Sequence, residues 1–282
     1  MTAPGVVRIG TRNPRLRRLR RLVGRSKARS EERAFVVDGP VLVAEALRSP
    51  VTVLEVFGAE EELADDALAT ALAGRPEIEV FEASASVLTE MLDPVTPRPL
   101  AAVVSAPDWA VDDLGPDRPV LVAVELRDPG NLGTMIRTAE AAGLAGVVVA
   151  GASVDPTAPK VVRASAGSVL RLPVVRFATA EEAIGSLGDG GRPVWAAVVQ
   201  PDAEPYDRVD LRRAAIVVGN EPHGLAPDVV RLGDGRLTIP VAETVESLNV
   251  AAAASVLSFE AARQRRSDRP KLAGHRDPGP ST

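Results

Sequence analysis

Short apolar runs alternate with stretches of helical periodicity from Phe35 onward, and this pattern predicts the elements of a first domain. Strands are predicted at residues 35–39, 51–58, 78–82 and 100–106, and helices at residues 40–49, 60–74 and 84–92. Strands that alternate with helices of about ten residues are typical of α/β domains. We therefore expect an α/β domain with a largely parallel sheet over residues 34–106.

The same alternation resumes after a segment rich in proline and aspartate, residues 107–119, which has no apolar period and is predicted to be a linker. A second α/β domain is expected over residues 120–265. Its strands are predicted at residues 120–125, 146–151, 172–177, 194–199, 214–219 and 237–240, and its helices at residues 132–142, 159–169, from Ala226 and at 247–264. Residues 266–282 are polar and rich in proline and glycine, so we expect a disordered tail.

Residues 1–33 are expected to form a basic arm and first helix ahead of the first domain. They hold eleven basic side chains and two acidic ones, a local charge of +9, whereas the whole chain of 282 residues has a formal charge of −5. Leu16, Leu19 and Val23 recur at helical spacing, which predicts an amphipathic helix at residues 14–24 with arginines on its remaining surface. Such a segment suits a phosphate backbone, although a merely solvated basic helix has the same pattern.

The amino-acid composition argues against several kinds of functional site. The chain has no cysteine and only two histidines, His223 and His275, so we expect no disulfide, no thiol nucleophile and no metal. No apolar run approaches the length of a membrane span and no secretory signal is recognisable, so we expect a cytoplasmic protein with no membrane partner. The phosphate-loop, dinucleotide-turn and nucleophile-elbow motifs are also absent from the sequence.

Three polar stretches of the second domain each follow a predicted strand, at the end where open α/β sheets place their ligands. The first is DPGNLGTMIRTAEAAG at residues 128–143, in which Asn131 is a possible helix N-cap and Arg137 follows six residues later among apolar or small residues. The second is VVGNEPHGL at residues 217–225, which is either an ordinary turn or a loop whose glycines let backbone approach a flat ligand. A structural role for His223 is favoured over a general base.

The third stretch, residues 237–265, leads into the last predicted helix. Ser247 is its expected N-cap, and the alanine run at residues 251–254 permits close packing against another helix. Asn249 is predicted in the first turn, where unpaired backbone N–H groups and the helix dipole favour anionic or polar ligands.

Together the three stretches resemble the three motifs of the SpoU (TrmH-type) RNA ribose 2′-O-methyltransferases, a branch of the SPOUT class. The matching patterns are N-L-G-x-x-x-R-T-A-x-x-x-G, G-N-E-x-x-G-L and I-P-x(6)-S-L-N-V. The resemblance covers about Val120 to Arg265, and residues 159–174 are similar to the connecting segment of the family. Residues 14–106 look like its N-terminal substrate-binding domain, a small fold similar to ribosomal L30e-type proteins. The family commonly has I-P-M followed two residues later by glycine, where this chain has Val241 and Glu243.

The resemblance implies a C-terminal SPOUT domain with a trefoil knot, S-adenosylmethionine as methyl donor, and a homodimer with the active site near its interface. The implied catalytic residues are Arg137, Asn131, Glu221, Ser247 and Asn249. The implied cofactor-binding residues are Gly219, Asn220, Glu221, Gly224, Leu225, Ile239, Pro240, Ser247, Leu248 and Asn249. The expected RNA-binding cations are Arg12, Arg15, Arg17, Arg18, Arg20, Arg21, Arg25, Lys27, Lys160 and Arg163.

The expected function is therefore 2′-O-methylation of a ribose in structured RNA, with 23S ribosomal RNA favoured as substrate. The guanidinium of Arg137 is always charged and is a poor base, so we hypothesise that it binds the adjacent phosphate and stabilises the developing alkoxide. Transfer RNA as substrate, a role in antibiotic self-resistance, and a non-catalytic RNA-binding assembly factor are the alternatives.

Overall fold

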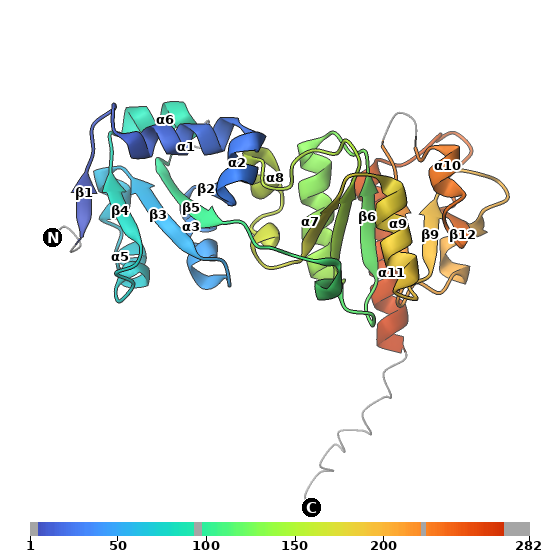
Figure 1. Ribbon diagram of the computed structural model, residues 1–282. Helices are drawn as coiled ribbons and strands as arrows, with labels where there is room; N and C mark the ends of the chain where they lie inside the picture. The colour runs from blue at the N-terminus through green and yellow to red at the C-terminus, as the bar shows by residue number, and fades with distance from the viewer. Residues whose placement is uncertain (1–4, 93–97, 221–223, 268–282) are drawn as a thin grey trace, which may run out of the picture.

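The computed structural model describes residues 5–92, 98–220 and 224–267, which form two units, each built on one sheet (Figure 1). The first unit has strands β1 (Val6–Arg8), β2 (Ala34–Asp38), β3 (Val53–Gly58), β4 (Glu79–Glu82) and β5 (Leu100–Ser105). Its helices are α1 (Pro14–Gly24), α2 (Ser26–Glu32), α3 (Pro40–Arg48), α4 (Glu60–Leu63), α5 (Asp66–Leu72) and α6 (Ala85–Leu92).

The first sheet has the strand order β1-β4-β3-β5-β2 and is mixed. Strand β5 runs antiparallel to both of its neighbours, β3 and β2, so the expected largely parallel sheet is wrong for this unit. The hydrophobic pattern did not reveal this because apolar alternation is the same for both strand directions. The helix expected at residues 60–74 is split in two, since the Asp65 carboxylate accepts the Leu68 N–H at 2.9 Å and begins α5 there.

The second unit is a seven-stranded parallel sheet, in the order β10-β12-β9-β11-β6-β7-β8. Its strands are β6 (Val120–Val124), β7 (Gly146–Ala150), β8 (Val174–Phe177), β9 (Val194–Ala197), β10 (Glu204–Pro205), β11 (Ala215–Val218) and β12 (Gly235–Thr238). Its helices are α7 (Pro129–Ala142), α8 (Pro159–Ala164), α9 (Ala180–Asp189), α10 (Pro227–Val230) and α11 (Val250–Ser267). Helix α8 ends earlier than expected because Ala166 and Gly167 adopt left-handed backbone angles, with φ of 48° and 85°.

Residues 6–33 pack into the first unit and are not a separate arm. Strand β1 pairs with β4, and Leu16, Leu19 and Leu22 of α1 are buried in the core beneath the helix. Five of the eight cations of this segment that we expect to bind RNA also pair with carboxylates of the same unit, Arg20 and Lys27 through the exposed Glu90 and Glu31. Arg15 pairs with Glu55 and Glu79, Arg18 with Glu55 and Glu32, and Arg21 with Glu32.

The Glu32 carboxylate is held by two of these arginines, at 2.6 Å from Arg18 and 2.5 Å from Arg21. Burial alone would raise the pKa of Glu32, but hydrogen bonds from Arg18 and Arg21 outweigh it and the pKa is lowered. The carboxylate therefore stays charged at neutral pH and the two arginines stay paired with it.

Direct ion pairs join the two units. Arg29 of α2 is buried and pairs with Asp155 at 2.6 Å, and Arg163 of α8 pairs with Asp38 of β2 at 2.8 Å. Arg163, which we expect to contact RNA, thus also makes an interdomain ion pair. A third arginine, Arg171, pairs with Glu45 of α3 at 2.7 Å.

Residues 107–119 run between the two sheets and pack on the second unit. Leu114 is buried in its core, and Arg192 and Arg213 donate to backbone carbonyls of Gly115 and Pro116. At the other end of the chain, α11 extends to Ser267, so residues 266 and 267 of the expected tail are helical. The rest of that tail lies outside the described residues. Within the described ranges no helix is long and apolar enough to cross a membrane.

Replacing Leu19 with alanine tests the packing of α1 on the sheet. Leu19 is fully buried, so Leu19→Ala leaves a cavity and should lower the free energy of unfolding by about 2–5 kcal/mol. Leu232→Ala removes the same atoms from a leucine that is 44% exposed and should change stability by less than about 0.5 kcal/mol. Chemical denaturation followed by circular dichroism measures both. Equal stability of the two variants would mean that α1 is not part of the folded core.

Candidate functional site

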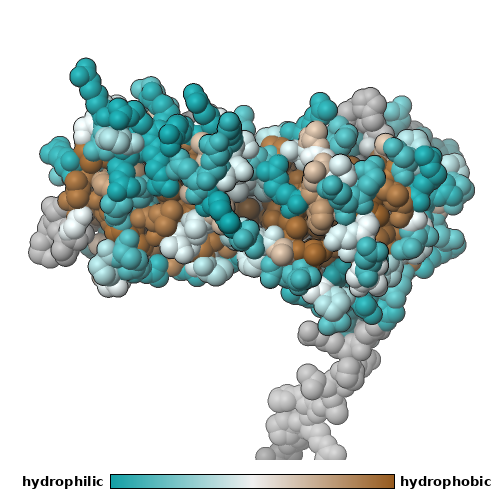
Figure 2. All heavy atoms as spheres, viewed as in Figure 1, coloured by the Kyte–Doolittle hydropathy of each residue, from teal (hydrophilic) through white to brown (hydrophobic). Residues whose placement is uncertain are grey.

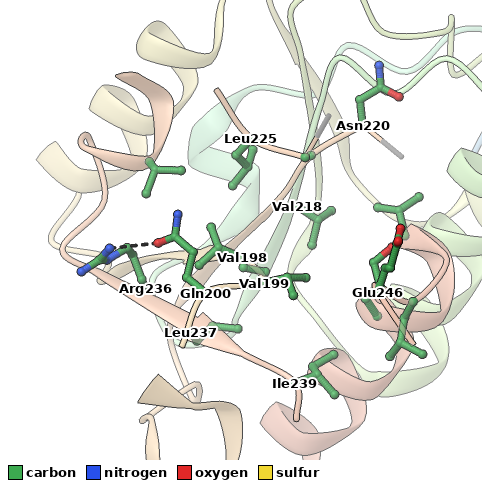
Figure 3. Close-up of a pocket in the computed structure, with 18 of the residues that line it drawn as sticks. Val198, Val199, Gln200, Val218, Asn220, Leu225, Arg236, Leu237, Ile239 and Glu246 are labelled. Atoms are coloured by element: carbon green, nitrogen blue, oxygen red, sulfur yellow. Dashed lines mark hydrogen bonds between the residues drawn. The ribbon is translucent and has the colours of Figure 1, made fainter. Parts of the chain in front are cut away.

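A pocket of about 550 Å³ lies at the carboxyl ends of β9, β11 and β12, beside the start of α11 (Figure 3). Val199, Val218, Leu225, Leu237 and Ile239 form much of its wall. These three strands are neighbours in the parallel sheet, which is why segments far apart in the sequence meet here. The pocket is apolar with a few polar side chains, as is typical of small-molecule sites.

The loop after β11 is shaped by two glycines. A Cβ atom at Gly219 would lie 2.4 Å from the carbonyl carbon and oxygen of Gly224, a distance that no side chain tolerates. Gly224 has φ of 64°, and its N–H donates to the Asn220 carbonyl at 2.8 Å. The backbone at Gly219 therefore lies against the backbone at Gly224 beside the pocket, and a larger residue at Gly219 would push the two apart.

Most of the cofactor-binding residues implied by the resemblance line this pocket. They are Gly219, Asn220, Gly224, Leu225, Ile239, Ser247 and Leu248. Pro240 and Asn249 are adjacent in sequence to lining residues but are not part of the wall. Glu221, expected both as a catalytic and as a cofactor-binding residue, and His223 lie outside the described residues.

The wall also includes residues that the motifs did not single out, Val198, Val199 and Gln200 after β9 among them. The Arg236 guanidinium donates to the Gln200 side-chain oxygen at 2.9 Å and pairs with Asp202 at 3.0 Å (Figure 3). This pair borders one side of the pocket, and Asn220 and Glu246 border the other (Figure 3). Gln200 could have been found from its position at the end of a predicted strand. That strand, β9, lies next to β11 in the sheet, so the ends of the two strands border the same pocket.

Helix α7 begins earlier than the sequence indicated. Its N-cap is Asp128, whose carboxylate accepts the Asn131 N–H at 2.8 Å, so Asn131 lies in the first turn and is not the cap. Gly133 on the same helix allows close contact with α8, because a Cβ there would lie 2.4 Å from the Cβ of Ala164. The small size of Gly133 thus allows helix packing. The side-chain amide of Asn131 has a different contact.

The contact partner of the Asn131 amide is Asn249 at the start of α11. The Asn249 side-chain amide donates to the Asn131 side-chain oxygen at 3.1 Å. Its own side-chain oxygen accepts the N–H groups of Ala251 and Ala252, at 2.9 and 3.2 Å. Asn249 is therefore the side-chain cap of α11, the role expected of Ser247, and Ser247 is left to line the pocket. The first and third motifs are joined by this one residue.

Arg137 lies two turns along α7 from Asn131. It is exposed, it does not line the pocket of its own chain, and it makes no ion pair or hydrogen bond with any residue in the described ranges. Its charge is thus available to a ligand in solution. The described part of the chain also holds no cluster of acidic or histidine side chains able to bind a metal ion.

Family models match both units. The SpoU rRNA methylase family model matches residues 118–259, and the MRM3-like substrate binding domain model matches residues 13–102. The chain belongs to the SpoU rRNA methylase family. The resemblance carried by the three motifs is thereby confirmed, and so is the assignment as an RNA 2′-O-methyltransferase.

Relatives of this SpoU family chain are similar over most of their length. The 23S rRNA (guanosine(2553)-2′-O)-methyltransferase RlmP of Bacillus subtilis is 34% identical over 83% of this chain and 90% of its own. The 23S rRNA (uridine(2479)-2′-O)-methyltransferase of Streptomyces viridochromogenes is 32% identical over 94% and 95%.

Solved structures of SpoU proteins match as well. The AdoMet-bound rRNA methyltransferase of Sinorhizobium meliloti has a TM-score of 0.81 at 28% identity, covering 92% of this chain and 98% of its own. AviRb of Streptomyces viridochromogenes in complex with AdoMet has a TM-score of 0.81 at 28% identity, covering 92% and 100%. The α/β fold with its parallel sheet is therefore shared with these SpoU methyltransferases.

Replacing Gly219 with alanine tests whether the folded-back loop forms the ligand site of this SpoU protein. The added Cβ pushes the backbone at Gly224 away, so Gly219→Ala should weaken binding of S-adenosylmethionine by about tenfold or more, or about 1.4 kcal/mol. Isothermal titration calorimetry measures the affinity. The matched control is Gly185→Ala in α9, where the added methyl meets no atom within 4 Å. Wild-type affinity in Gly219→Ala would place the ligand elsewhere.

Proposed function

We propose that this chain transfers a methyl group from S-adenosylmethionine to a ribose 2′-hydroxyl in 23S ribosomal RNA. The observation that carries the proposal is the pocket at the ends of β9, β11 and β12, which brings the second and third motifs together. The Asn249–Asn131 hydrogen bond links the first motif to the start of α11, which borders the pocket. The names of the two relatives, which both act on 23S rRNA ribose groups, support this substrate class.

The pocket suits the proposed cofactor. Its volume of about 550 Å³ lies within the range of about 300–1,000 Å³ typical of small-molecule sites. The apolar wall of Val218, Leu225 and Ile239 fits a flat base, and the backbone at Gly219 and the polar groups of Asn220 and Ser247 would hold its polar parts. When bound, the cofactor supplies an electrophilic methyl group on a sulfonium sulfur.

The residues of this chain then have to bind and orient the ribose. The Arg137 guanidinium is a charged fork of donors on an exposed helix surface, so we assign to it the phosphate next to the reactive ribose and the developing negative charge on the 2′-oxygen. The hydroxyl proton leaves to that phosphate or to water, because arginine does not accept it. Orientation by fixed groups contributes several kcal/mol to such a displacement.

The N-terminal unit supplies the RNA-binding surface in this proposal. We define the basic ridge as Arg12, Arg17, Arg20, Arg25 and Lys27, the exposed cations at the start and along the length of α1 and α2. Arg12, Arg17 and Arg25 make no ion pair with any residue of the described part, whereas Arg20 and Lys27 have exposed partners at 3.2 and 3.7 Å. Lys160 of α8 is exposed as well. Together these cations suit phosphate contacts that neither read nor require a particular base.

We also propose a homodimer that forms through α11. Ala252, Val256 and Phe259 recur at helical spacing and are exposed, with Phe259 48% exposed. An exposed apolar stripe on a helix is typical of a protein–protein contact. Because Arg137 does not line the pocket of its own chain, a second copy is the natural source of the missing catalytic side chain.

Three further features follow the family resemblance. We propose that the methyltransferase unit carries a trefoil knot, which is supported by the insertion of β11 between β6 and β9 in the sheet. The N-terminal unit is proposed to be an L30e-like fold, and the protein to act in the cytoplasm. A role in protecting the ribosome against an antibiotic would use the same methyl-transfer reaction. Transfer RNA is the other substrate to test.

Removing the Arg137 side chain tests the catalytic assignment. Arg137→Ala should lower the rate of labelled methyl transfer to 23S rRNA by roughly 10²–10³-fold, because one donor to a developing oxyanion is lost. The affinity for S-adenosylmethionine should not change. Arg75→Ala removes an exposed arginine from the first unit and serves as the control. Near-normal turnover in Arg137→Ala would refute the assignment, and methylation of transfer RNA alone by the wild type would refute the proposed substrate.

Placing a charge in the α11 stripe tests the dimer. Phe259→Glu should convert the protein to a monomer, because an unpaired carboxylate in an apolar contact is strongly unfavourable. Size-exclusion chromatography with light scattering gives the mass. Val41→Glu changes a valine that is 74% exposed on α3 and should leave the mass unaltered. The proposal fails if the wild type is monomeric, or if Phe259→Glu stays dimeric.

A further inference from the structure

A second cavity, of about 170 Å³, lies between the two units and apart from the cofactor pocket. On one side it is lined by Arg29 and Arg33 at α2 and by Trp109, and on the other by Asp155 after β7 and Arg176 of β8. We propose that this cavity binds a phosphate group of the RNA backbone, so that the RNA touches both units at once. The inference rests on the proposed function, because it assumes an RNA substrate.

The inner wall of the cavity is a buried ion pair. The Asp155 carboxylate accepts hydrogen bonds from the Arg29 guanidinium at 2.6 and 3.0 Å and from the Ser26 hydroxyl at 2.7 Å. Its other oxygen accepts the Thr157 hydroxyl at 2.7 Å and the Thr157 N–H at 2.9 Å. The Arg29 side chain is only 6% exposed and the Asp155 side chain 11%, so this wall is fixed in place.

The charge of Asp155 is compensated within that wall. Burial alone would raise the pKa of Asp155, but hydrogen bonds from Ser26 and Thr157 and the charge of Arg29 outweigh it, and the pKa is lowered. Asp155 is therefore ionised at neutral pH, and its negative charge is balanced by Arg29 at 2.6 Å. An anion entering the cavity meets a neutral pair and is not repelled.

The surplus charge at the cavity is positive and comes from Arg176. Its only ion pair with a described residue is a loose one of 3.8 Å to Asp155, and 53% of its side chain is exposed. Arg33 adds a second cation, whose pair with Asp108 at 2.7 Å joins two exposed side chains and is readily exchanged for another anion. The left-handed φ of 47° at Arg33 ends α2 at the cavity.

Two further observations favour an anionic oxygen as the ligand. The indole nitrogen of Trp109 is buried and has no acceptor among the described residues, and leaving such an N–H without an acceptor is unfavourable. A phosphate oxygen is an acceptor of the kind that it lacks. The cavity also has room for about six water molecules at about 30 Å³ each, which suits one phosphate and is too small for a nucleoside.

The location agrees with a path for RNA along the basic ridge. Helix α1 runs along one edge of the first unit toward the second, and α2 follows at the end nearest α8 (Figure 1). Hydrophilic side chains cover this edge up to the junction between the units (Figure 2). A backbone that follows Arg17 and Arg25 thus reaches the second unit at the cavity. A phosphate bound there fixes the RNA relative to the methyltransferase unit.

Salt dependence of RNA binding tests the inference. Arg176→Ala should weaken binding of a 23S rRNA transcript by about tenfold and reduce the slope of log K against log salt by about one, because one phosphate contact is lost. Arg33→Ala should have the same effect to a smaller extent. Arg176→Lys keeps the charge and should recover most of the slope. Affinity for S-adenosylmethionine and the melting temperature should stay at wild-type values in each variant.

The control is Arg75→Ala, an exposed arginine that does not line the cavity. If Arg176→Ala binds the transcript with the wild-type affinity and salt slope, the phosphate site is refuted. That outcome is distinct from failure of the proposed function, in which the wild-type protein transfers no methyl group to 23S rRNA. A loss of affinity with an unchanged slope would also count against a phosphate contact.

Discussion

The hydrogen bond from Asn249 to Asn131 is the contact on which the proposed active site depends. It joins the first turn of α7 to the N-cap of α11, because the same Asn249 side chain caps α11 through the N–H groups of Ala251 and Ala252. One amide thus caps α11 and links its start to α7. Ser247 and Leu248, immediately before this cap, are thereby held at the pocket wall. A different capping residue would start the helix without linking the two motifs.

The strand and helix alternation was readable from the sequence, because apolar periodicity is a local property of the chain. The antiparallel direction of β5 was not, since it depends on which strands become neighbours. Helix α9 was missed although Ala183, Ile184 and Leu187 recur at helical spacing and Thr179 caps it through the Glu182 N–H. The two-residue strand β10 has no pattern to detect, because it is defined only by its pairing with β12.

For the candidate site, the motifs indicated which residues are involved, but not which of them cap helices and which line the pocket. The loop glycines and Ser247 line the pocket as the resemblance implied, whereas Asn249 acts as the cap and Asp128 takes the capping role considered for Asn131. Gln200 and Arg236 were missed because their placement depends on the order of strands in the sheet. A helix cap and a pocket-lining residue lie only one or two positions apart in the sequence. The residue types alone therefore do not show which side chain has which role.

The basic segment illustrates why a count of charges does not locate a binding surface. Arg15, Arg18 and Arg29 lie in the same short stretch as Arg17 and Arg25, yet the first three pair with carboxylates at least partly shielded from water. Helical spacing directs every third or fourth arginine toward the protein and leaves the others facing solvent. The paired arginines hold α1 on its sheet and α2 on the second unit, and so determine where the unpaired ones stand. Because carboxylates neutralise the paired arginines, the unpaired Arg17 and Arg25 are left as exposed charges for the phosphate contacts that we propose.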